Sequence, residues 1–364
     1  MTTRFFTGVL VLLVALAGAA NAGEWSKTTE NTPLSSIYNL KNQAIAVNGK
    51  VFVVSQNASQ DALKGVHVFN PATGAHEALI KSNPSTDLVS LGFYPLNIDV
   101  DGSKIYAMEF NPPPAAFLMR LRAYNKTTGS VAWTSTEDLG YSSIKACGDK
   151  VLAEYMTPIG YGLAGYGVKA LNAGSGSTAW THSNGITLLP NDGFLYRMLG
   201  TDGIHCDAVN AFVIDGQDHA YLYKLSLSSG QASLGSNYVK MPMSLPVSVV
   251  SDGDPEGFVY VSSGLDNESI LKYKKGTLEL EQEVKNVPAS RLSLLGEYLA
   301  ATSDGAITVY RLPGLSVART FTVPGMSFNS SSVLASEGGK TVLYSTGIVS
   351  GSGTTSKTTR LELD

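Results

Sequence analysis

The segment YNKTTGSVAWTS, residues 124–135, returns almost unchanged as LNAGSGSTAWTH, residues 171–182. Both copies contain an asparagine, a glycine four residues later and a tryptophan four residues after the glycine. Asparagine and glycine favour tight turns, and the β-branched and aromatic residues around them favour strands. Each copy therefore predicts a β-hairpin, and the 47-residue spacing predicts that this hairpin belongs to a repeating unit.

Four further segments follow the same plan in a degenerate form, beginning at residues 69, 225, 273 and 310. Another hairpin precedes each of them, as in IAVNGKVFVV and KACGDKVLAEY. These earlier hairpins begin near residues 43, 96, 143, 206, 246, 289 and 331. Repeats of about 40–50 residues with four short strands each are typical of propeller blades. We therefore expect an all-β, seven-bladed β-propeller of four-stranded blades. Two stacked β-sandwiches are the alternative, which the even spacing disfavours.

The seventh unit ends early, because TTRLELD supplies only its third strand. An unpaired outer edge is an aggregation hazard. Residues 23–30, GEWSKTTE, resemble VAWTSTE, the fourth strand of the second unit. We predict that this N-terminal strand completes the last blade, and that Trp25, Trp133 and Trp180 occupy equivalent positions at which an indole packs between blades.

The N-terminus has the pattern of a secretory signal peptide over residues 1–22: Arg4, an apolar stretch at 5–16 and an A-x-A cleavage site at 20–22. Residues 23–364 are then a single propeller domain. No later stretch has the roughly 18 apolar residues that a membrane span requires. The net charge of −4 gives no reason to expect nucleic acid as a partner. We expect a protein of the secretory pathway, either secreted or in the ER lumen.

Export bears on two further sets of residues. Cys147 and Cys206 fall in the innermost strands of the third and fourth units, and an oxidising compartment permits a disulfide between them, which the sequence leaves open. Four N-x-[ST] sequons are candidate glycosylation sites on surface loops, although so short a pattern also arises by chance. They are Asn57, Asn125, Asn267 and Asn329.

The pattern hydrophobic-Asn-x-x-[TS]-Gly-x-x-x-Trp in residues 124–133 and 171–180 resembles the repeat of quinoprotein-like (PQQ-like) β-propellers. More narrowly, the exported start, the strand with Trp25 and LKYKKGTLELEQEV look somewhat like the lumenal propeller of ER membrane protein complex subunit 1. The second resemblance implies a non-catalytic scaffold at the ER membrane.

Quinoprotein dehydrogenases, the enzyme relatives that the first resemblance implies, hold a quinone between a tryptophan and a vicinal disulfide, with calcium. Cys147 and Cys206 are 59 positions apart, so this chain has no vicinal pair and we expect no cofactor. Residues 99–103 and 251–257 have spaced carboxylates like part of a calcium loop. They lack the later glutamate, so we interpret both as turns and expect no metal. The run His205-Cys206-Asp207 cannot converge within one strand, because neighbouring side chains face opposite sides.

A partner surface is expected on the face that carries the longer loops of blades 2–4. Segments 110–119, 155–167, 184–203 and 241–245 are rich in Pro, Tyr, Phe and Met and nearly uncharged, as interface cores are. No sequon falls on that sector. The predicted anchors are Phe117, Tyr161, Tyr166, Phe194 and Tyr196.

With no catalytic residues assigned, the leading interpretation is a non-catalytic protein-binding scaffold of the secretory pathway. The alternatives are a secreted enzyme (a lyase, a hydrolase or a degenerate quinoprotein) and a carbohydrate or small-ligand binder that uses the central channel. Converging His, Asp, Glu and Arg at the channel mouth would favour an enzyme, and an open apolar rim would favour a scaffold.

Overall fold

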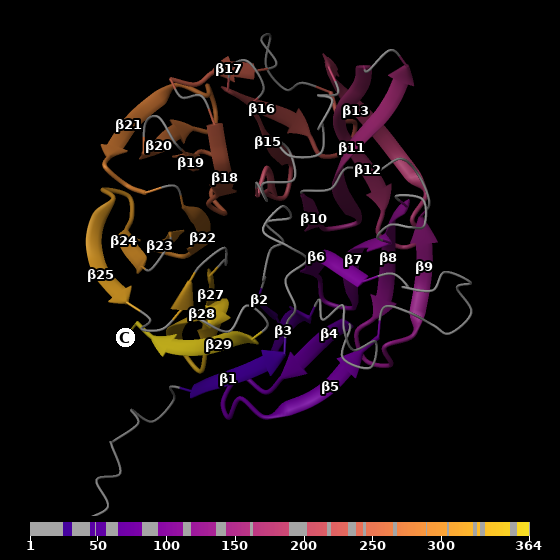
Figure 1. Ribbon diagram of the computed structural model, residues 1–364. Coiled ribbons are helices and arrows are strands. Elements are labelled where there is room, and N and C mark those ends of the chain that lie inside the picture. Colours follow the sequence, from indigo (N-terminus) through magenta and orange to yellow (C-terminus); the bar gives the residue numbers. More distant parts are fainter. Residues whose placement is uncertain are drawn as a thin grey trace, which may run out of the picture.

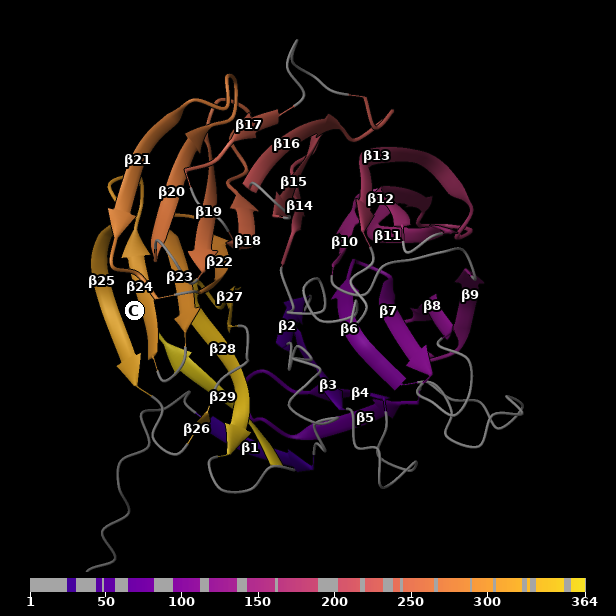
Figure 2. The ribbon, with the colours of Figure 1, turned by 45° about the horizontal axis from the view of Figure 1, so that its top comes forward.

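The computed structural model shows a ring of seven β-sheets around a central axis (Figures 1 and 2). The predicted all-β, seven-bladed propeller is confirmed. The structure describes residues 25–30, 44–47, 49–55, 65–81, 94–111, 118–135, 143–160, 163–188, 202–216, 220–231, 238–242, 245–264, 268–288, 290–303, 306–322, 326–327, 332–349 and 355–363.

Each blade is an antiparallel sheet whose first strand lines the axis and whose last strand lies at the rim (Figure 2). Blades 1 to 3 comprise β2 (Ala44–Val47), β3 (Lys50–Ser55), β4 (Gly65–Phe69) and β5 (His76–Ile80); β6 (Tyr94–Val100), β7 (Lys104–Asn111), β8 (Leu118–Asn125) and β9 (Val131–Ser135); and β10 (Ile144–Cys147), β11 (Lys150–Gly160), β12 (Leu163–Asn172) and β13 (Thr178–Leu188). Blades 4 to 6 comprise β14 (Ile204–Cys206), β15 (Asn210–Gly216), β16 (Ala220–Ser226) and β17 (Tyr238–Lys240); β18 (Leu245–Ser251), β19 (Phe258–Gly264), β20 (Ser269–Lys274) and β21 (Leu280–Lys285); and β22 (Arg291–Leu295), β23 (Tyr298–Ser303), β24 (Ala306–Arg311) and β25 (Ser316–Thr322). Blade 7 comprises β27 (Ser332–Glu337), β28 (Lys340–Val349), β29 (Thr355–Glu362) and β1 (Trp25–Glu30), with the short β26 (Met326–Ser327) beside β28.

The seven innermost strands begin within two residues of the positions that the sequence predicted. The turn between the third and fourth strands of a blade explains why asparagine and glycine recur in the sequence. In blade 2 the side-chain carbonyl of Asn125 accepts hydrogen bonds from the backbone N–H groups of Thr127 and Thr128, at 3.0 and 3.2 Å. Gly129 then closes the turn in the left-handed region, at φ 68°. Asparagine and glycine are therefore required by the local geometry of the hairpin.

The core is divided among the blade interfaces. The described buried apolar side chains form seven clusters, one at each seam between consecutive blades. The last of these joins Val51, Val53 and Phe69 of blade 1 to Val342 and Tyr344 of blade 7. Alternation along a strand places successive side chains in the two seams on either side of a blade, which is why the strands are apolar on both faces.

The N-terminal strand lies where the sequence predicted it, since β1 pairs antiparallel with β29 and supplies the outer strand of blade 7 (Figure 1). Its register differs from the expected one. Trp25 lies opposite Arg360, which pairs with Tyr344, four residues past the start of β28. Trp180 lies opposite Ala170, which pairs with Leu152, only two residues past the start of β11. No turn joins β29 to β1, so no turn sets their register. The structure does not describe the side chain of Trp25, so its predicted packing between blades stays a prediction.

Candidate functional site

The strands of blade 3 are unusually long, with 11 residues in β11, 10 in β12 and 11 in β13. They pair as far as Gly160 opposite Leu163 and Leu163 opposite Leu188. Most of segment 155–167, predicted to be a loop, is therefore a strand pair, and 184–188 continues β13. The glycines of this segment permit close strand contact, so it forms strands where we expected a loop. A Cβ on Gly167 would lie 2.0 Å from the His182 carbonyl oxygen, where β13 bulges across it.

Tyrosines of blade 4 collect in the seam between blades 3 and 4. The ring centroids of Tyr221 and Tyr238 are 4.9 Å apart in an edge-to-face arrangement, and those of Tyr223 and Tyr238 are 5.5 Å apart. The His182 ring, from blade 3, is 5.9 Å from Tyr223. Tyr223 is buried, whereas Tyr238 is 50% exposed on the short outer strand β17. The cluster thus presents an aromatic surface to solvent.

Polar groups lie among these rings. The Asn184 side-chain amide donates a 3.3 Å hydrogen bond to Asp215 Oδ2, from β13 to β15. Burial, with the charge of Asp215, raises the pKa of Tyr223, so this phenol stays neutral and able to donate. Burial lowers the pKa of His182, which keeps its ring neutral at pH 7. We call this set the 3–4 seam; its members are Tyr166, His182, Asn184, Asp215, Tyr221, Tyr223 and Tyr238.

Of the five predicted anchor residues, the structure places Tyr166 alone. It lies in β12 and is buried, 8% exposed, so it supports the seam from within and is not the exposed loop anchor that we expected. Phe117, Tyr161, Phe194 and Tyr196 lie outside the described residues. The sequence analysis missed Tyr221, Tyr223 and Tyr238. The alternation Tyr-Leu-Tyr at 221–223 was the available signal, since it places two rings on one face of a strand.

The inner strands of blades 3 and 4 are joined covalently. Cys147 and Cys206 form a disulfide between β10 and β14, with their Cα atoms 6.1 Å apart. Next to it, His205 Nδ1 accepts a 3.2 Å hydrogen bond from the backbone N–H of Ser251 in blade 5. Desolvation, with the charges of Lys145 and Lys275, lowers the pKa of His205 to about 3. The ring is therefore a neutral acceptor between blades, which makes it a poor general base at neutral pH.

Other inner-strand side chains bind the next blade in the same way. Asp99 Oδ2 accepts from the Ala146 N–H at 2.8 Å and lies 3.2 Å from Lys145 Nζ. Ser248 Oγ accepts from the Leu292 N–H at 3.0 Å. Charged side chains do converge near His205, since Lys145, Lys275, Asp207 and Asp202 all affect its pKa, and an enzyme would require such a convergence. Asp99 Oδ2, Ser248 Oγ and His205 Nδ1 each accept a hydrogen bond from the next blade, which favours a structural role for these side chains.

The carboxylate-rich loop at 251–257 encloses a cation that the protein supplies itself. The Lys275 side chain is fully buried, and its Nζ lies 3.1 Å from Asp252 Oδ1 and 3.3 Å from Asp207 Oδ2. The ammonium also donates to the carbonyls of Asp252 and Asp254. The loop is thus a turn folded around an ammonium group that links blades 4 and 5. The other loop is a turn as expected, in which Asp101 Oδ1 accepts from the N–H groups of Ser103 and Lys104. The described side chains include no group of three or more His, Cys, Asp or Glu arranged to hold a metal ion.

The fold is shared with known structures. No protein-family model and no curated protein matches the sequence. A chain in the crystal structure of the mitotic checkpoint complex superposes with a TM-score of 0.62, over 93% of this chain and 95% of that one, at 10% identity. BamB from Moraxella catarrhalis gives a TM-score of 0.49, over 92% of this chain and 100% of that one, at 12% identity. At these identities the similarity concerns fold alone.

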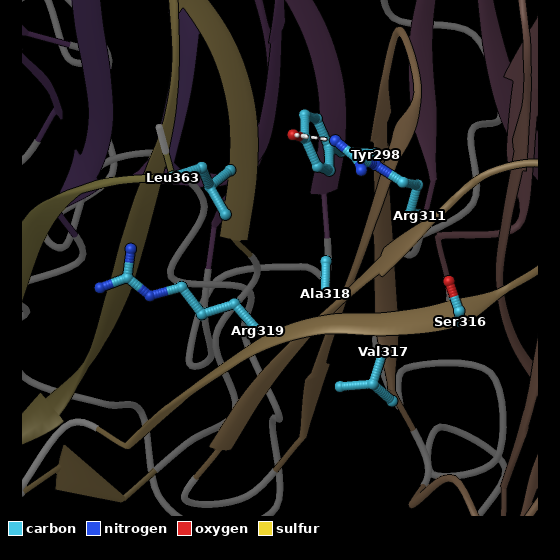
Figure 3. A pocket seen from close by; sticks show the side chains of 7 residues that line it. All are labelled: Tyr298, Arg311, Ser316, Val317, Ala318, Arg319 and Leu363. Atoms are coloured by element: carbon cyan, nitrogen blue, oxygen red, sulfur yellow. Dashed lines mark hydrogen bonds between the residues drawn. The ribbon is translucent and has the colours of Figure 1, made fainter.

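A pocket of about 310 Å³ lies where blade 6 meets the end of β29 (Figure 3). It is lined by Tyr298, Arg311, Ser316, Val317, Ala318, Arg319 and Leu363. Its two cations already have partners. Arg311 Nε lies 3.3 Å from Glu297 Oε2, and Arg319 donates at 3.0 Å to the Glu362 carbonyl. These internal partners leave the pocket a weaker candidate than the 3–4 seam.

Of the four sequons, Asn125 alone lies in the described part of the chain. It is exposed at the end of β8, where the turn to β9 begins, on the face opposite the predicted partner surface. Asn57, Asn267 and Asn329, and the signal-peptide segment 1–22, lie outside it. Within the described ranges, no helix is long and apolar enough to cross a membrane.

Proposed function

We propose that this propeller is a non-catalytic interaction scaffold of the secretory pathway, and that a protein partner binds the long-loop face at blades 3 and 4. The observation that carries the proposal is the half-exposed Tyr238 ring, which packs against Tyr221 and Tyr223 in the seam between blades 3 and 4. Tyrosine is enriched at the centres of protein interfaces, because it combines a large apolar surface with a polar tip.

Other contacts in the same seam make this surface rigid. The Cys147–Cys206 disulfide ties together the inner strands of the same two blades, and Tyr166 is buried close enough to Tyr223 to affect its pKa. A rigid platform loses little conformational entropy when a partner binds. The signal-peptide pattern, the sequons and the disulfide are mutually consistent with an exported protein. The narrower assignment, a role like that of ER membrane protein complex subunit 1, rests on the sequence resemblance alone.

A glycan wedge tests the proposal. The double substitution Tyr238→Asn and Lys240→Thr creates the sequon Asn-Val-Thr at two exposed positions of β17. The protein would be expressed through the secretory pathway of cultured cells, and the co-purified proteins compared quantitatively with those of wild type. We expect the glycosylated variant to lose the partners that wild type recovers, while it melts at the same temperature.

The matched control is Tyr238→Asn with Lys240→Ala, which changes the same residues but accepts no glycan. It separates the effect of the bulk from the loss of the tyrosine. Recovery of the full set of partners by the glycosylated protein would place the interface elsewhere on the propeller.

A further inference from the structure

The sequon Asn125-Lys126-Thr127 begins at the end of β8 and continues into the turn to β9, and we infer that Asn125 carries an N-linked glycan. The inference rests on the proposed place of the protein in the secretory pathway. A sequon by itself is weak evidence, because so short a pattern also arises by chance. The hydrogen bonds of Asn125 supply the stronger evidence, since they distinguish it from the asparagines at the same position of other blades.

The fold uses the backbone and the side-chain oxygen of Asn125. Its backbone N–H donates to the Ser130 carbonyl, and its carbonyl accepts from the Gly129 N–H, both at 2.8 Å. Its side-chain Oδ1 accepts from the N–H groups of Thr127 and Thr128 at 3.0 and 3.2 Å. These two donors set the orientation of the amide, since the opposite orientation would place Nδ2 against N–H groups. The remaining atom, Nδ2, is the one to which an N-linked glycan is attached.

This nitrogen is accessible. Asn125 is exposed, and among the described residues its Nδ2 has no hydrogen-bond partner. Thr127, which completes the sequon, is exposed as well. Lys126 between them is held by the neighbouring turn, because its N–H donates to the Ser103 carbonyl at 3.0 Å and its Nζ to the Asp101 carbonyl at 3.2 Å. A glycan on Nδ2 therefore leaves these hydrogen bonds in place.

The corresponding asparagines of blades 1 and 3 use the same nitrogen within the protein. Asn70 Nδ2 donates to Glu77 Oε1 at 3.2 Å, and Asn172 Nδ2 donates to Ser177 Oγ at 3.0 Å. Both asparagines are less exposed than Asn125. Neither belongs to a sequon, since the second residue after it is alanine in blade 1 and glycine in blade 3. The asparagine of this repeat position that lies in a sequon is thus also the one whose nitrogen the fold leaves to solvent.

A glycan at Asn125 also bears on the partner surface. It would cover the turns at this end of blade 2, on the face opposite the proposed partner surface. N-linked glycans are bulky and solubilising, so a protein interface excludes them. The glycan therefore keeps this face of blade 2 in solvent, while the long-loop face stays open to the partner.

Mass spectrometry provides the direct test. The protein is expressed through the secretory pathway of cultured animal cells and treated with peptide-N-glycosidase, which removes the glycan and converts the modified asparagine to aspartate. We expect the peptide that contains Asn125 to show this conversion in most molecules. An unmodified Asn125 in most molecules of the secreted protein would overturn the inference.

Two substitutions at one position separate the glycan from the fold. Thr127→Ser keeps the sequon and should keep the glycan, whereas Thr127→Ala removes the sequon and should lose it. Both retain the backbone N–H that Asn125 Oδ1 accepts, so both proteins should melt as wild type does once the glycan is removed. Masses of the two secreted variants that differ only by their side chains would show that no glycan is attached to Asn125.

The two proposals fail differently. The Thr127→Ala protein should recover the same partners as wild type, because the lost glycan lay on the opposite face. If other sequons carry glycans and Asn125 does not, export stands and the inference is wrong. If Asn125 carries a glycan while the wedge at β17 leaves every partner in place, the inference stands and the scaffold surface lies elsewhere. A protein that keeps residues 1–22 and carries no glycan would overturn both.

Discussion

The indole of Trp180 in blade 3 lies directly against Gly230 in the turn of blade 4. A Cβ on Gly230 would lie 2.4 Å from Trp180 Cε3, and the indole Nε1 donates a 2.9 Å hydrogen bond to the Leu227 carbonyl. Trp133 makes the equivalent contacts one blade earlier, against Gly176 and the Ala173 carbonyl. The tryptophan of one repeat therefore packs against the glycine of the next repeat, across the seam between the two blades.

This contact predicts a graded series of glycine substitutions. Gly230→Ala adds a clash with the indole to the strain of φ +70°, and should lower the free energy of unfolding by about 2–4 kcal/mol. Gly296→Ala has a similar φ, +56°, with open space around it, and should cost about 1 kcal/mol. Gly253→Ala has neither feature and should stay within about 0.5 kcal/mol of wild type. Urea denaturation measures all three; equal losses for Gly230→Ala and Gly296→Ala would mean that the indole contact contributes nothing.

The enclosed ammonium of Lys275 predicts that calcium can restore stability when this side chain is removed. Lys275→Ala leaves the carboxylates of Asp207 and Asp252 facing an empty space, so the free energy of unfolding should fall by about 3–5 kcal/mol. Carboxylate and carbonyl oxygens are calcium ligands. Millimolar calcium should therefore raise the melting temperature of Lys275→Ala and leave that of wild type unchanged. Lys275→Met fills the space and is the matched control, which calcium should not rescue. A melting temperature of Lys275→Ala that does not respond to calcium would contradict this account of the loop.

The disulfide predicts a redox-dependent stability. It closes a loop of 59 residues, so replacing both Cys147 and Cys206 by alanine should cost about 4 kcal/mol. Reductant should lower the melting temperature of wild type toward that of the double variant and leave the variant unchanged. Two free thiols in the purified, denatured wild type would show that the bond does not form.

His205 predicts a pH dependence of stability. Its pKa of about 3 in the folded protein is far below the value of roughly 6.5 in the unfolded chain. Between these values the unfolded chain binds more protons, so the free energy of unfolding should fall as pH drops from about 6.5, by at most about 1.4 kcal/mol per pH unit. Above about pH 6.5 this contribution is constant. His205→Gln keeps an acceptor for the Ser251 N–H but does not titrate, so its curve should be flatter than that of wild type. Parallel curves for the two proteins would exclude His205 as the cause.

The N-terminal strand predicts complementation in trans. Deleting residues 23–30 exposes the edge of β29, which six residues of β1 cover, and should lower the melting temperature sharply. A synthetic peptide of residues 23–30 should restore part of the loss, as strand addition does elsewhere. The same peptide with Thr28→Pro cannot pair through that residue and should not restore it. If the protein without residues 23–30 melts as the protein that begins at residue 23 does, β1 contributes little to closing the ring.

The blade plan could be predicted from sequence because each hairpin is specified within about ten residues. Asn125 and Gly129 set a turn through contacts with their own neighbours, and such a signal repeats wherever the hairpin repeats. The pairing of β1 with β29 followed from one inference, that the seventh unit lacks a strand. The possibility of the Cys147–Cys206 bond followed from the same blade count, since it placed both cysteines on adjacent inner strands.

The tertiary structure alone decided which residues share a seam. Asn184 and Asp215 are 31 residues apart and meet because blade 3 packs on blade 4; Lys275 meets Asp207 in the same manner, across blades 4 and 5. Tyr166 was predicted to lie in an exposed loop and is buried in a strand for the same reason. Glycine-rich sequence permits both a loop and a close strand contact, and the His182 carbonyl that requires glycine at position 167 belongs to another strand. Local sequence determines turns and strands through neighbours in the chain, whereas a binding surface depends on packing between blades, which no local pattern records.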